Sequence, residues 1–503
     1  MIQIDQFLLE LEKSIGLFKP ETALVVTFVV ALMSDLVFKK SKNIAGYVAI
    51  LGLITSGAYL GYQEAATDGA FTGMLAVDPF AKFIKYLVLM SSLAIVLMSF
   101  FSKELNKDDR NMGEYYSLIV GMTFGMYLLA GATNLLMVYL AIETMSISSY
   151  ILAGYTKEIK RASEASLKYV IFGAVASGIM IYGISILFGL TGTMNLMEIN
   201  ALVAAGTLDI APLMVSGLLI IAGIAYKISA VPFHFWTPDV YEGAPVTITA
   251  YLSVASKAAG IALLIRFLMA GFVNYHHQEF EGEWTVLSGI DWKYIIAILS
   301  VLTMTIGNFV ALWQTNLKRM FAYSSIAHAG YMLMAVAVMT DLGIASVLVY
   351  LVMYLFMNTG AFFVVMLLAD KIGSEELDDY KGLGYQAPVM GAAMTIFMIS
   401  LTGLPPTAGF IGKLYVFSAV VDAGMLWLAV VGVINSVVSL FYYAKVFRNM
   451  FVRGVDNDKK EFQFHPMAYA LLMVFVIPVL YLGLFPDFVL DWATSSVGIF
   501  MGM

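Results

Sequence analysis

The stretch Lys227 to Pro245, KISAVPFHFWTPDVYEGAP, interrupts an otherwise apolar part of the chain. It follows the run LMVSGLLIIAGIAY of residues 213–226, where a buried ammonium group costs roughly 2.5–3.5 kcal/mol. Five residues after Lys227, Pro232 removes a backbone donor and breaks the helix, and a mixed polar segment follows before the next apolar helix begins. A charged, broken helix within a membrane indicates an ion path.

The composition is that of a membrane protein. Hydrophobic residues make up 60% of the 503 residues and charged residues 13%, which is outside the range of a soluble domain. Since a span needs ~20 apolar residues, about fourteen transmembrane helices fit into this length. We therefore expect an all-α polytopic membrane protein. Its net charge of −7, without any basic cluster interleaved with aromatic residues, does not indicate nucleic-acid binding.

The chain carries no motif for redox, nucleotide or metal chemistry. It has no cysteine, which excludes disulfides, thiolate zinc sites and cysteine-ligated iron–sulfur clusters. It also lacks the GxGxxG, GxxxxGK[ST] and HExxH patterns. Any redox chemistry is therefore expected on partner chains.

Apolar runs and loop charges predict the topology. The runs predict spans near 20–38, 43–63, 79–101, 112–131, 133–155, 162–190, 211–231, 244–271, 293–314, 320–340, 344–369, 388–421 (interrupted), 425–447 and 467–485. Basic residues gather in alternate loops: Lys39, Lys40, Lys42, Lys103, Lys107, Arg110, Lys157, Lys160, Arg161, Lys318, Arg319, Lys371, Lys381, Arg448, Arg453, Lys459 and Lys460. The opposite loops are often acidic, with Glu64, Asp68, Asp78, Glu198, Asp209, Glu279, Glu281, Glu283 and Asp291. The basic side should face the cytoplasm, with both termini on the outer side.

Few ionisable groups are expected within the spans: Glu143, Lys168, Lys227, Lys257 and Lys413, with His234 and His328 nearby. Four lysines cannot all pair with one glutamate, so some should bind water or be neutral, because desolvation disfavours the charged form. Such groups within a membrane are functional by default. The structural alternatives are a helix-packing carboxyl for Glu143, snorkelling for Lys168, a carbonyl-capping cation for Lys257 and a buried core histidine for His328.

A second break is predicted in SLTGLPPTAGFIGKLYVF, residues 400–417, where Pro405 and Pro406 interrupt an apolar run and Lys413 follows. Interrupted helices in both halves of a chain are typical of transporters built from repeats. We therefore predict two five-helix repeats, 112–271 and 293–447, each with a broken helix. An odd number of spans makes the second copy inverted. Three N-terminal spans occupy 1–111, and a loop with the last span occupies 448–503.

Four segments carry a resemblance to a known family: RASEASLKYVIFGAVASG (161–178), KISAVPFHFWTPDVYEGAPVTITAYLSVASKAAG (227–260), NLKRMFAYSSIAHAGYM (316–332) and LTGLPPTAGFIGKLYVF (401–417). Over residues 112–450 the chain resembles the antiporter-like membrane subunits of respiratory complex I. Multisubunit sodium/proton antiporters and membrane-bound hydrogenases share this family. The lysine in TAGFIGK, the YEGAP loop that leads into SVASKAAG and the short segment after Pro486 favour the subunit N branch.

The resemblance implies a proton-translocating subunit of NADH:quinone oxidoreductase, driven by quinone reduction on partner subunits, with each repeat a proton half-channel. It implies that Glu143 and Lys227 form a coupling ion pair and that Lys257 is the central proton carrier. Lys413 would be the carrier of the second half-channel. Lys168, His234 and His328 would form a supporting polar axis.

The same resemblance implies that no cofactor is bound by this chain, while NADH, FMN, iron–sulfur clusters and quinone are bound by its partners. The implied partners are the antiporter-like M and L types, the small K, J and A types and the quinone-site H type, in a bacterial inner membrane. One alternative is a sodium/proton antiporter or hydrogenase assembly of the same fold. The other is a structural scaffold whose buried charges only orient helices.

Overall fold

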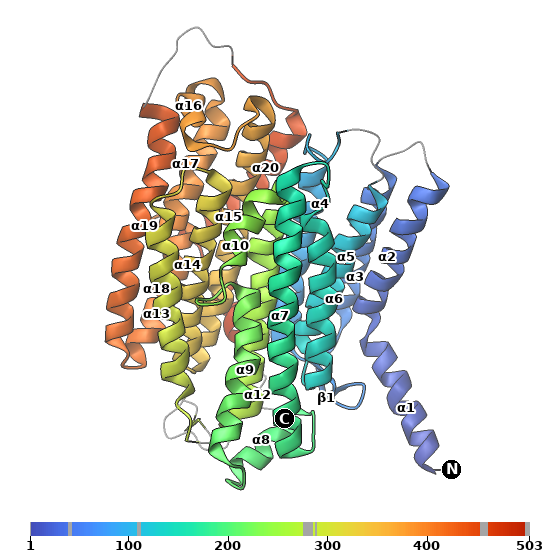
Figure 1. The fold of residues 1–503 in the computed structure, drawn as a ribbon. Coiled ribbons are helices and arrows are strands. Elements are labelled where there is room, and N and C mark those ends of the chain that lie inside the picture. Colours follow the sequence, from blue (N-terminus) through green and yellow to red (C-terminus); the bar gives the residue numbers. More distant parts are fainter. Residues whose placement is uncertain are drawn as a thin grey trace.

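The computed structural model describes residues 2–38, 43–107, 112–274, 285–286, 289–452 and 461–497. Long helices run side by side in one bundle, with short helices and strands near its ends (Figure 1). Several of the loop charges used above lie outside the described residues: Lys39, Lys40, Lys42, Arg110, Glu279, Glu281, Glu283, Arg453, Lys459 and Lys460.

The elements follow one another in three groups. The N-terminal group is α1 (Ile2–Leu17), α2 (Lys19–Val37), α3 (Ile44–Tyr62), β1 (Ala66–Ala70), β2 (Leu75–Val77) and α4 (Pro79–Ser99). The middle group is α5 (Gly113–Gly131), α6 (Leu135–Ala153), α7 (Lys160–Thr191), α8 (Leu196–Ala204), α9 (Ile210–Ile228), α10 (Trp236–Gly243), α11 (Val246–Tyr251), the π-helix η1 (Leu252–Ser256), α12 (Lys257–Phe272) and the strands β3 (Val273–Asn274) and β4 (Thr285–Val286). The last group is α13 (Trp292–Ala311), α14 (Leu317–Ala337), α15 (Asp341–Ile372), the 3₁₀-helix η2 (Leu377–Tyr380), α16 (Leu383–Gln386), α17 (Pro388–Thr402), α18 (Ala408–Asp422), α19 (Leu426–Val452), α20 (Pro466–Leu484) and α21 (Asp487–Val497).

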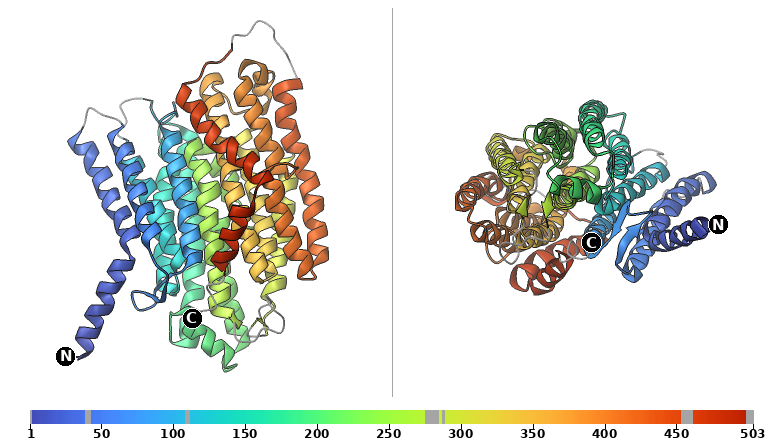
Figure 2. Two further views of the ribbon diagram at one scale, coloured as in Figure 1. Left: turned by 180° about the vertical axis from the view of Figure 1, so that it is seen from behind. Right: turned by 90° about the horizontal axis from the view of Figure 1, so that it is seen from below.

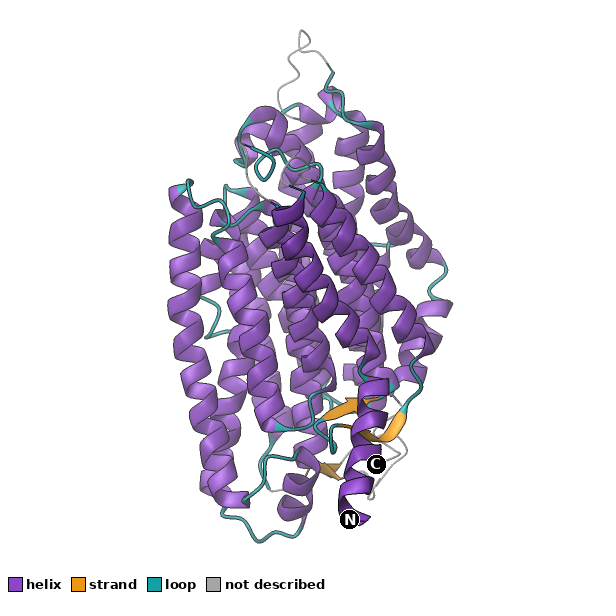
Figure 3. Cartoon of the chain, turned by 90° about the vertical axis from the view of Figure 1, so that its right-hand side faces the viewer, coloured by secondary structure: helices purple, strands orange, loops and turns teal. Residues whose placement is uncertain are grey.

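The all-α membrane architecture is confirmed. Within the described ranges, 12 helices are long and apolar enough to cross a membrane. The two remaining predicted spans correspond to α5 and to the broken pair α17–α18, so the count of about fourteen stays a prediction. The sequence did not predict α1, α8, α21 or the antiparallel pairs β1–β2 and β3–β4, which are too short to read as spans. The strands lie towards the end of the bundle where α1 lies (Figure 3).

Matching features support the predicted repeats, which remain a proposal. Both α7 and α15 have 32 residues and end at a glycine with positive φ, Gly192 and Gly373. Both α6 and α14 follow an asparagine, Asn134 or Asn316, whose side chain accepts a hydrogen bond from the first turn. However, α6 begins at the end of the bundle near β1, whereas α14 begins at the opposite end (Figure 1). This opposite placement of α6 and α14 is what the proposed inversion of the second repeat requires.

Two helix breaks occur where proline predicted them. The end of α9 is capped by Ser229 at φ 62°, and the end of α17 by Gly403 at φ 88°. A cis peptide bond before Pro232 and another before Pro406 follow these caps. In the proposed repeats, the first break follows the fourth predicted span and the second lies within the fourth.

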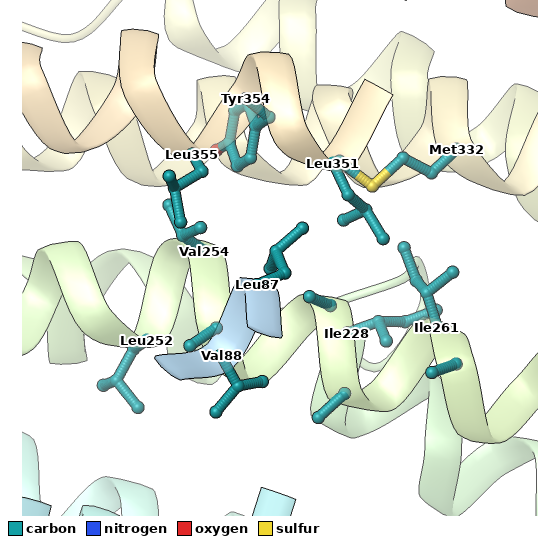
Figure 4. Close-up of a cluster of buried hydrophobic side chains, with 14 of the residues drawn as sticks. Leu87, Val88, Ile228, Leu252, Val254, Ile261, Met332, Leu351, Tyr354 and Leu355 are labelled. Carbon is teal, nitrogen blue, oxygen red and sulfur yellow. The ribbon is translucent and has the colours of Figure 1, made fainter. Parts of the chain in front are cut away.

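The core of the bundle is formed by the segment α11–η1–α12 with α14 and α15. In the apolar stretches of these helices, 100%, 94% and 94% of the residues are buried, compared with 33% in α2 and in α3. In Figure 4, apolar side chains of α4, α12 and α15, such as Leu87, Ile261 and Leu351, point towards one another. The N-terminal helices lie at one edge of the bundle and α19 at the opposite edge (Figure 2). The central helices are therefore shielded, and two of the candidate residues, Lys257 on α12 and His328 on α14, lie on them.

Candidate functional site

Lys227 is in the last turn of α9, directly before the first break, and only 2% of it is exposed. Its Nζ donates to Oγ of Ser146 on α6 at 2.9 Å. The same ammonium lies 6.0 Å from the ring centroid of Tyr150 and 5.7 Å from that of Tyr169. Ring faces stabilise a cation at this range when it is desolvated.

The predicted ion pair between Glu143 and Lys227 is not formed in this structure. Oε1 of Glu143 is buried without a hydrogen-bond partner, and no ion pair within 4.0 Å joins the two residues. The reason is geometric, since Ser146 lies three residues after Glu143 on the same face of α6. The ammonium is therefore bound one turn along the helix from the carboxyl group that was expected to hold it.

Lys257 follows the π-helix η1 at the start of α12 and is 1% exposed. A π-helical turn inside an α-helix is frequently found at a functional site. Nζ of Lys257 donates to Oγ of Ser325 on α14 at 2.8 Å and lies 6.0 Å from the ring centroid of Tyr241. The ammonium thus has a hydroxyl partner rather than a carboxylate.

Lys413 is on α18 after the second break and is 4% exposed. Its Nζ donates to the Thr402 carbonyl at 2.7 Å and to Oγ of Ser436 at 2.9 Å. The side chain of Lys413 folds back against Gly403. A Cβ added to Gly403 would lie only 2.6 Å from Cδ of Lys413. The carbonyl at the end of α17, which the break frees from helical bonding, therefore binds this lysine.

One face of α14 connects Lys257 to Lys413. Ser325, His328 and Tyr331 lie three residues apart on it, and Tyr331 presents its ring 4.7 Å from Nζ of Lys413. His328 is 2% exposed and bonds hydroxyl groups at both ring nitrogens, Tyr350 at 2.6 Å from Nδ1 and Tyr443 at 3.0 Å from Nε2. His328 is also within electrostatic reach of both lysines. The histidine is therefore fully hydrogen-bonded between the two candidate carriers.

His234 lies in the first break, 7% exposed, and its Nδ1 is buried without a protein partner. It is within electrostatic reach of Lys257. Tyr241, Ser256 and Tyr354 also have buried hydroxyl groups without a partner. Buried polar groups of this kind are usually satisfied by internal water. The region around Lys257 is thus polar enough to hold water.

Lys168 differs from the other candidates because its side chain is 38% exposed. It pairs with Glu164 and with Asp239, each at 2.7 Å, and borders a pocket of about 300 Å³ that Arg161, Glu242 and Arg319 also line. Partial burial alone would raise the pKa of Asp239, but the hydrogen bonds that it accepts from Lys168 and Arg319 lower it below its usual range. Lys168 thus belongs to a partly exposed ion-pair cluster and lies apart from the buried lysines.

The expectation that only these few ionisable groups lie inside the bundle was wrong. Two further ion pairs are buried: Lys85 with Glu21 at 2.6 Å, and Arg266 with Asp78 at 2.8 Å. Asp78 was assigned to a loop, whereas it caps α4 and binds Arg266 with both oxygens. Arg266 itself, inside the run IALLIRFLMAGF, was the sequence signal for a buried partner. In the described part of the chain, no cluster of His, Asp and Glu is suited to hold a metal ion.

Comparison with known proteins agrees with this architecture. Residues 132–439 match the family model described as NADH:quinone oxidoreductase/Mrp antiporter, TM. NADH-quinone oxidoreductase subunit N 2 of Chloroherpeton thalassium is 48% identical and aligns over 96% of this chain and 94% of its own. Subunit N of Chlorobium chlorochromatii is 45% identical, covering 99% and 98% of the two chains.

Solved structures give the same result. A chain of respiratory complex I from Thermus thermophilus, with aureothin bound, is 28% identical and has a TM-score of 0.77 over 95% of this chain and all (100%) of its own. A chain of an archaeal membrane-bound sulfane sulfur reductase is 21% identical with a TM-score of 0.85, covering 96% and 97%, which shows a shared fold. The chain therefore belongs to the NADH:quinone oxidoreductase/Mrp antiporter membrane family, and within it to the subunit N branch.

Proposed function

We propose that this chain is the proton-translocating subunit N of a membrane-bound NADH:quinone oxidoreductase and that Lys227, Lys257 and Lys413 carry the protons. The observation that carries this proposal is the bonding of these lysines. Each is at most 4% exposed, and its Nζ is held by hydroxyl or carbonyl oxygens, with no carboxylate within ion-pair distance among the described residues.

A hydroxyl partner suits a lysine that changes its protonation state. A serine hydroxyl has one donor hydrogen and two acceptor lone pairs. It therefore accepts from an ammonium group and donates to a neutral amine. A carboxylate would instead stabilise only the charged form and hold the proton. Ser146, Ser325 and Ser436 provide this partner in turn for the three lysines.

In the proposed route, separation of the Glu143–Lys227 pair precedes protonation of Lys257, and Lys413 releases the proton. The present arrangement, with Lys227 on Ser146, corresponds to the separated state. Each transfer converts one ammonium group to an amine and the next amine to an ammonium group. The α14 face that carries His328 would bridge the step from Lys257 to Lys413.

The finer assignments rest on family membership. We propose that the chain assembles with the M and L types, the small K, J and A types and the quinone-site H type. NADH, FMN, iron–sulfur clusters and quinone would be bound by those and other partners. The complex would lie in a bacterial inner membrane with both termini of this chain on the outer side. The repeats 112–271 and 293–447 would be the two half-channels.

The test uses the complete complex in proteoliposomes, with protons pumped per electron delivered to quinone as the readout. Lys257→Ala should lower this ratio strongly. Lys445→Ala is the matched control. Lys445 is also a lysine, half-buried, and its Nζ donates to the Gln314 carbonyl at 3.3 Å rather than to any group bonded by Lys227, Lys257 or Lys413. Normal pumping per assembled complex in Lys257→Ala, with only assembly impaired, would overturn the proposal in favour of a scaffold.

A further inference from the structure

A second set of buried polar side chains lies where α4 faces α5, and the proposed row of lysines does not include it. On α4, Lys85, Ser92 and Ser99 are seven residues apart and at most 4% exposed. Seven residues are nearly two helical turns, so these side chains share one face. On α5, the facing polar residues are Tyr116, Thr123 and Tyr127, also buried. We call these six residues the α4–α5 seam.

One end of the seam contains a buried ion pair that is only partly satisfied. Nζ of Lys85 lies 2.6 Å from Oε1 of Glu21, with 5% and 3% of the two side chains exposed. Oε2 of Glu21 and the hydroxyl of Tyr127 are buried without partners, and Nζ of Lys85 lies 5.8 Å from the Tyr127 ring centroid. The hydroxyl of Ser56 on α3 donates to the Pro20 carbonyl at 2.8 Å and not to Oε2 of Glu21.

The pair of Asp78 with Arg266 shows what a purely structural buried pair looks like in the same bundle. Both carboxylate oxygens of Asp78 accept from the guanidinium, at 2.8 and 3.0 Å, and Oδ1 also accepts from a backbone amide. Arg266 further donates to the Ala130 carbonyl. A buried ion pair adds little stability unless such bonds satisfy its remaining lone pairs. The Glu21–Lys85 pair lacks them, so stability alone does not account for it.

The middle of the seam reaches the helix that carries the central lysine. Ser92, Thr123 and Tyr251 form a closed triangle of hydroxyl contacts, with O···O distances of 2.9, 2.6 and 2.7 Å. Tyr251 is the last residue of α11, directly before the π-helix η1, which leads to Lys257. Beyond the triangle, Ser99 bonds Tyr116 at 3.0 Å. The ion pair, the triangle and the Ser99–Tyr116 pair thus follow one another along the seam, and the triangle reaches the segment that leads to Lys257.

We propose that the α4–α5 seam is a second proton path, which joins a proton-binding carboxyl at Glu21 to the helix of Lys257. This inference rests on the proposed function. A hydronium ion adds its proton to Oε2 of Glu21, which gives a neutral carboxylic acid and water, and the reverse step releases the proton. Neighbouring levels of the seam are about 10 Å apart along the helices, so internal water must bridge them. The titratable groups that face Glu21 are Lys85 from α4 and Tyr127 from α5.

Two threonines provide a matched test in the complete complex. Thr123 and Thr27 are both buried and both bond the carbonyl four residues earlier, at 2.8 and 2.6 Å. Only Thr123 also contacts Ser92 and Tyr251. Thr123→Val and Tyr251→Phe should lower the protons pumped per electron, whereas Thr27→Val should not. Equal ratios in Thr123→Val, Tyr251→Phe and the unchanged complex would overturn the seam.

A double variant tests the ion pair without leaving a buried charge alone. Glu21→Gln with Lys85→Met should assemble and lower the pumping ratio, and infrared spectra during turnover should lose a carboxylic-acid band that Thr27→Val retains. An unchanged ratio and an unchanged band would refute the proton-binding role. Lys257→Ala, measured in parallel, separates the two proposals. If only Lys257→Ala loses pumping, proton transfer by the three lysines is supported and the path along the α4–α5 seam is refuted. If no variant loses pumping, both proposals are refuted.

Discussion

The two helix breaks differ in the way that they hold a lysine. At the first break, Lys227 precedes the proline and reaches across to Ser146 on another helix, one turn from Glu143. At the second break, Lys413 follows the proline and bonds back to the Thr402 carbonyl of its own broken helix, with Ser436 as a second partner. The first lysine has an alternative partner close by on the same face of α6, whereas the second is tied to the backbone.

This difference assigns different tasks to similar elements. A side chain that bonds one of two neighbouring groups on a helix can change partners by rotating about its own flexible chain. A side chain bonded to a fixed carbonyl keeps its position whatever its charge. We therefore expect Lys227 to act as the switch that responds to Glu143, and Lys413 to act as a stationary relay.

The largest effect is expected from removing the switch. Glu143→Ala and Lys227→Ala should each reduce proton pumping to near the background of vesicles without coupling, because the pair can no longer form or separate. The measurement is protons pumped per electron in proteoliposomes that contain the assembled complex. Wild-type pumping in both variants would rule out the switch.

The relay is tested through the glycine beside it. Gly403→Ala introduces a Cβ 2.6 Å from Cδ of Lys413 at a φ of 88°, so Lys413 must move and the backbone is strained. The strain should cost of order 1–3 kcal/mol, seen as a lower thermal stability of the complex.

Gly424→Ala separates strain from displacement of the lysine. Gly424 has a φ of 73° with nothing within 4 Å of the added Cβ, so it shares only the strain. Pumping should fall in Gly403→Ala and remain normal in Gly424→Ala. Equal pumping in the two variants would show that the position of Lys413 is not important.

The serine partners should respond unequally. Ser146→Ala removes the hydroxyl partner of Lys227, a hydrogen bond to a charged group worth about 1.5–3 kcal/mol, and should drive Lys227 towards Glu143. Ser436→Ala leaves the Thr402 carbonyl in place and should have a smaller effect. The pumping ratio, measured over a range of pH, compares the two variants. A larger loss in Ser436→Ala would reverse the assignment of switch and relay.

The smallest effect is expected at the ion-pair cluster around Lys168, outside both breaks. Because the pKa of Asp239 is lowered in the folded protein, its stabilising contribution is present above the usual aspartate range and is lost as the pH falls through the lowered value. Asp239→Asn should cost only about 0.2–1 kcal/mol near neutral pH, since solvent screens these groups. Thermal unfolding of the complex at neutral and acidic pH measures this, with Glu164→Gln as the exposed control. A pH-independent difference would contradict the role of the carboxylate.

Several features were predictable from local sequence. The apolar runs predicted the helices because about 20 apolar residues are required to cross a bilayer. Pro232 and Pro406 predicted both breaks, because proline cannot continue the hydrogen bonding of a helix. Lys227, Lys257 and Lys413 were predicted to be buried because each lies within or at the end of an apolar run.

Other features depended on which helices meet in space. The Glu21–Lys85 and Asp78–Arg266 pairs join residues 64 and 188 positions apart, and no local pattern connects such partners. The ion-pair cluster around Lys168 likewise depends on Asp239 from α10 and Arg319 from α14.

The amino-acid sequence by itself determined the membrane class, the helix breaks and the identity of the buried lysines. These follow from the cost of placing polar groups in an apolar medium, a cost that each segment meets on its own. Only the tertiary structure decided that Lys227 bonds Ser146 instead of Glu143, and that the α4–α5 seam exists. A hydrogen bond requires two atoms within about 3 Å, and only the packing of distant helices determines which atoms meet.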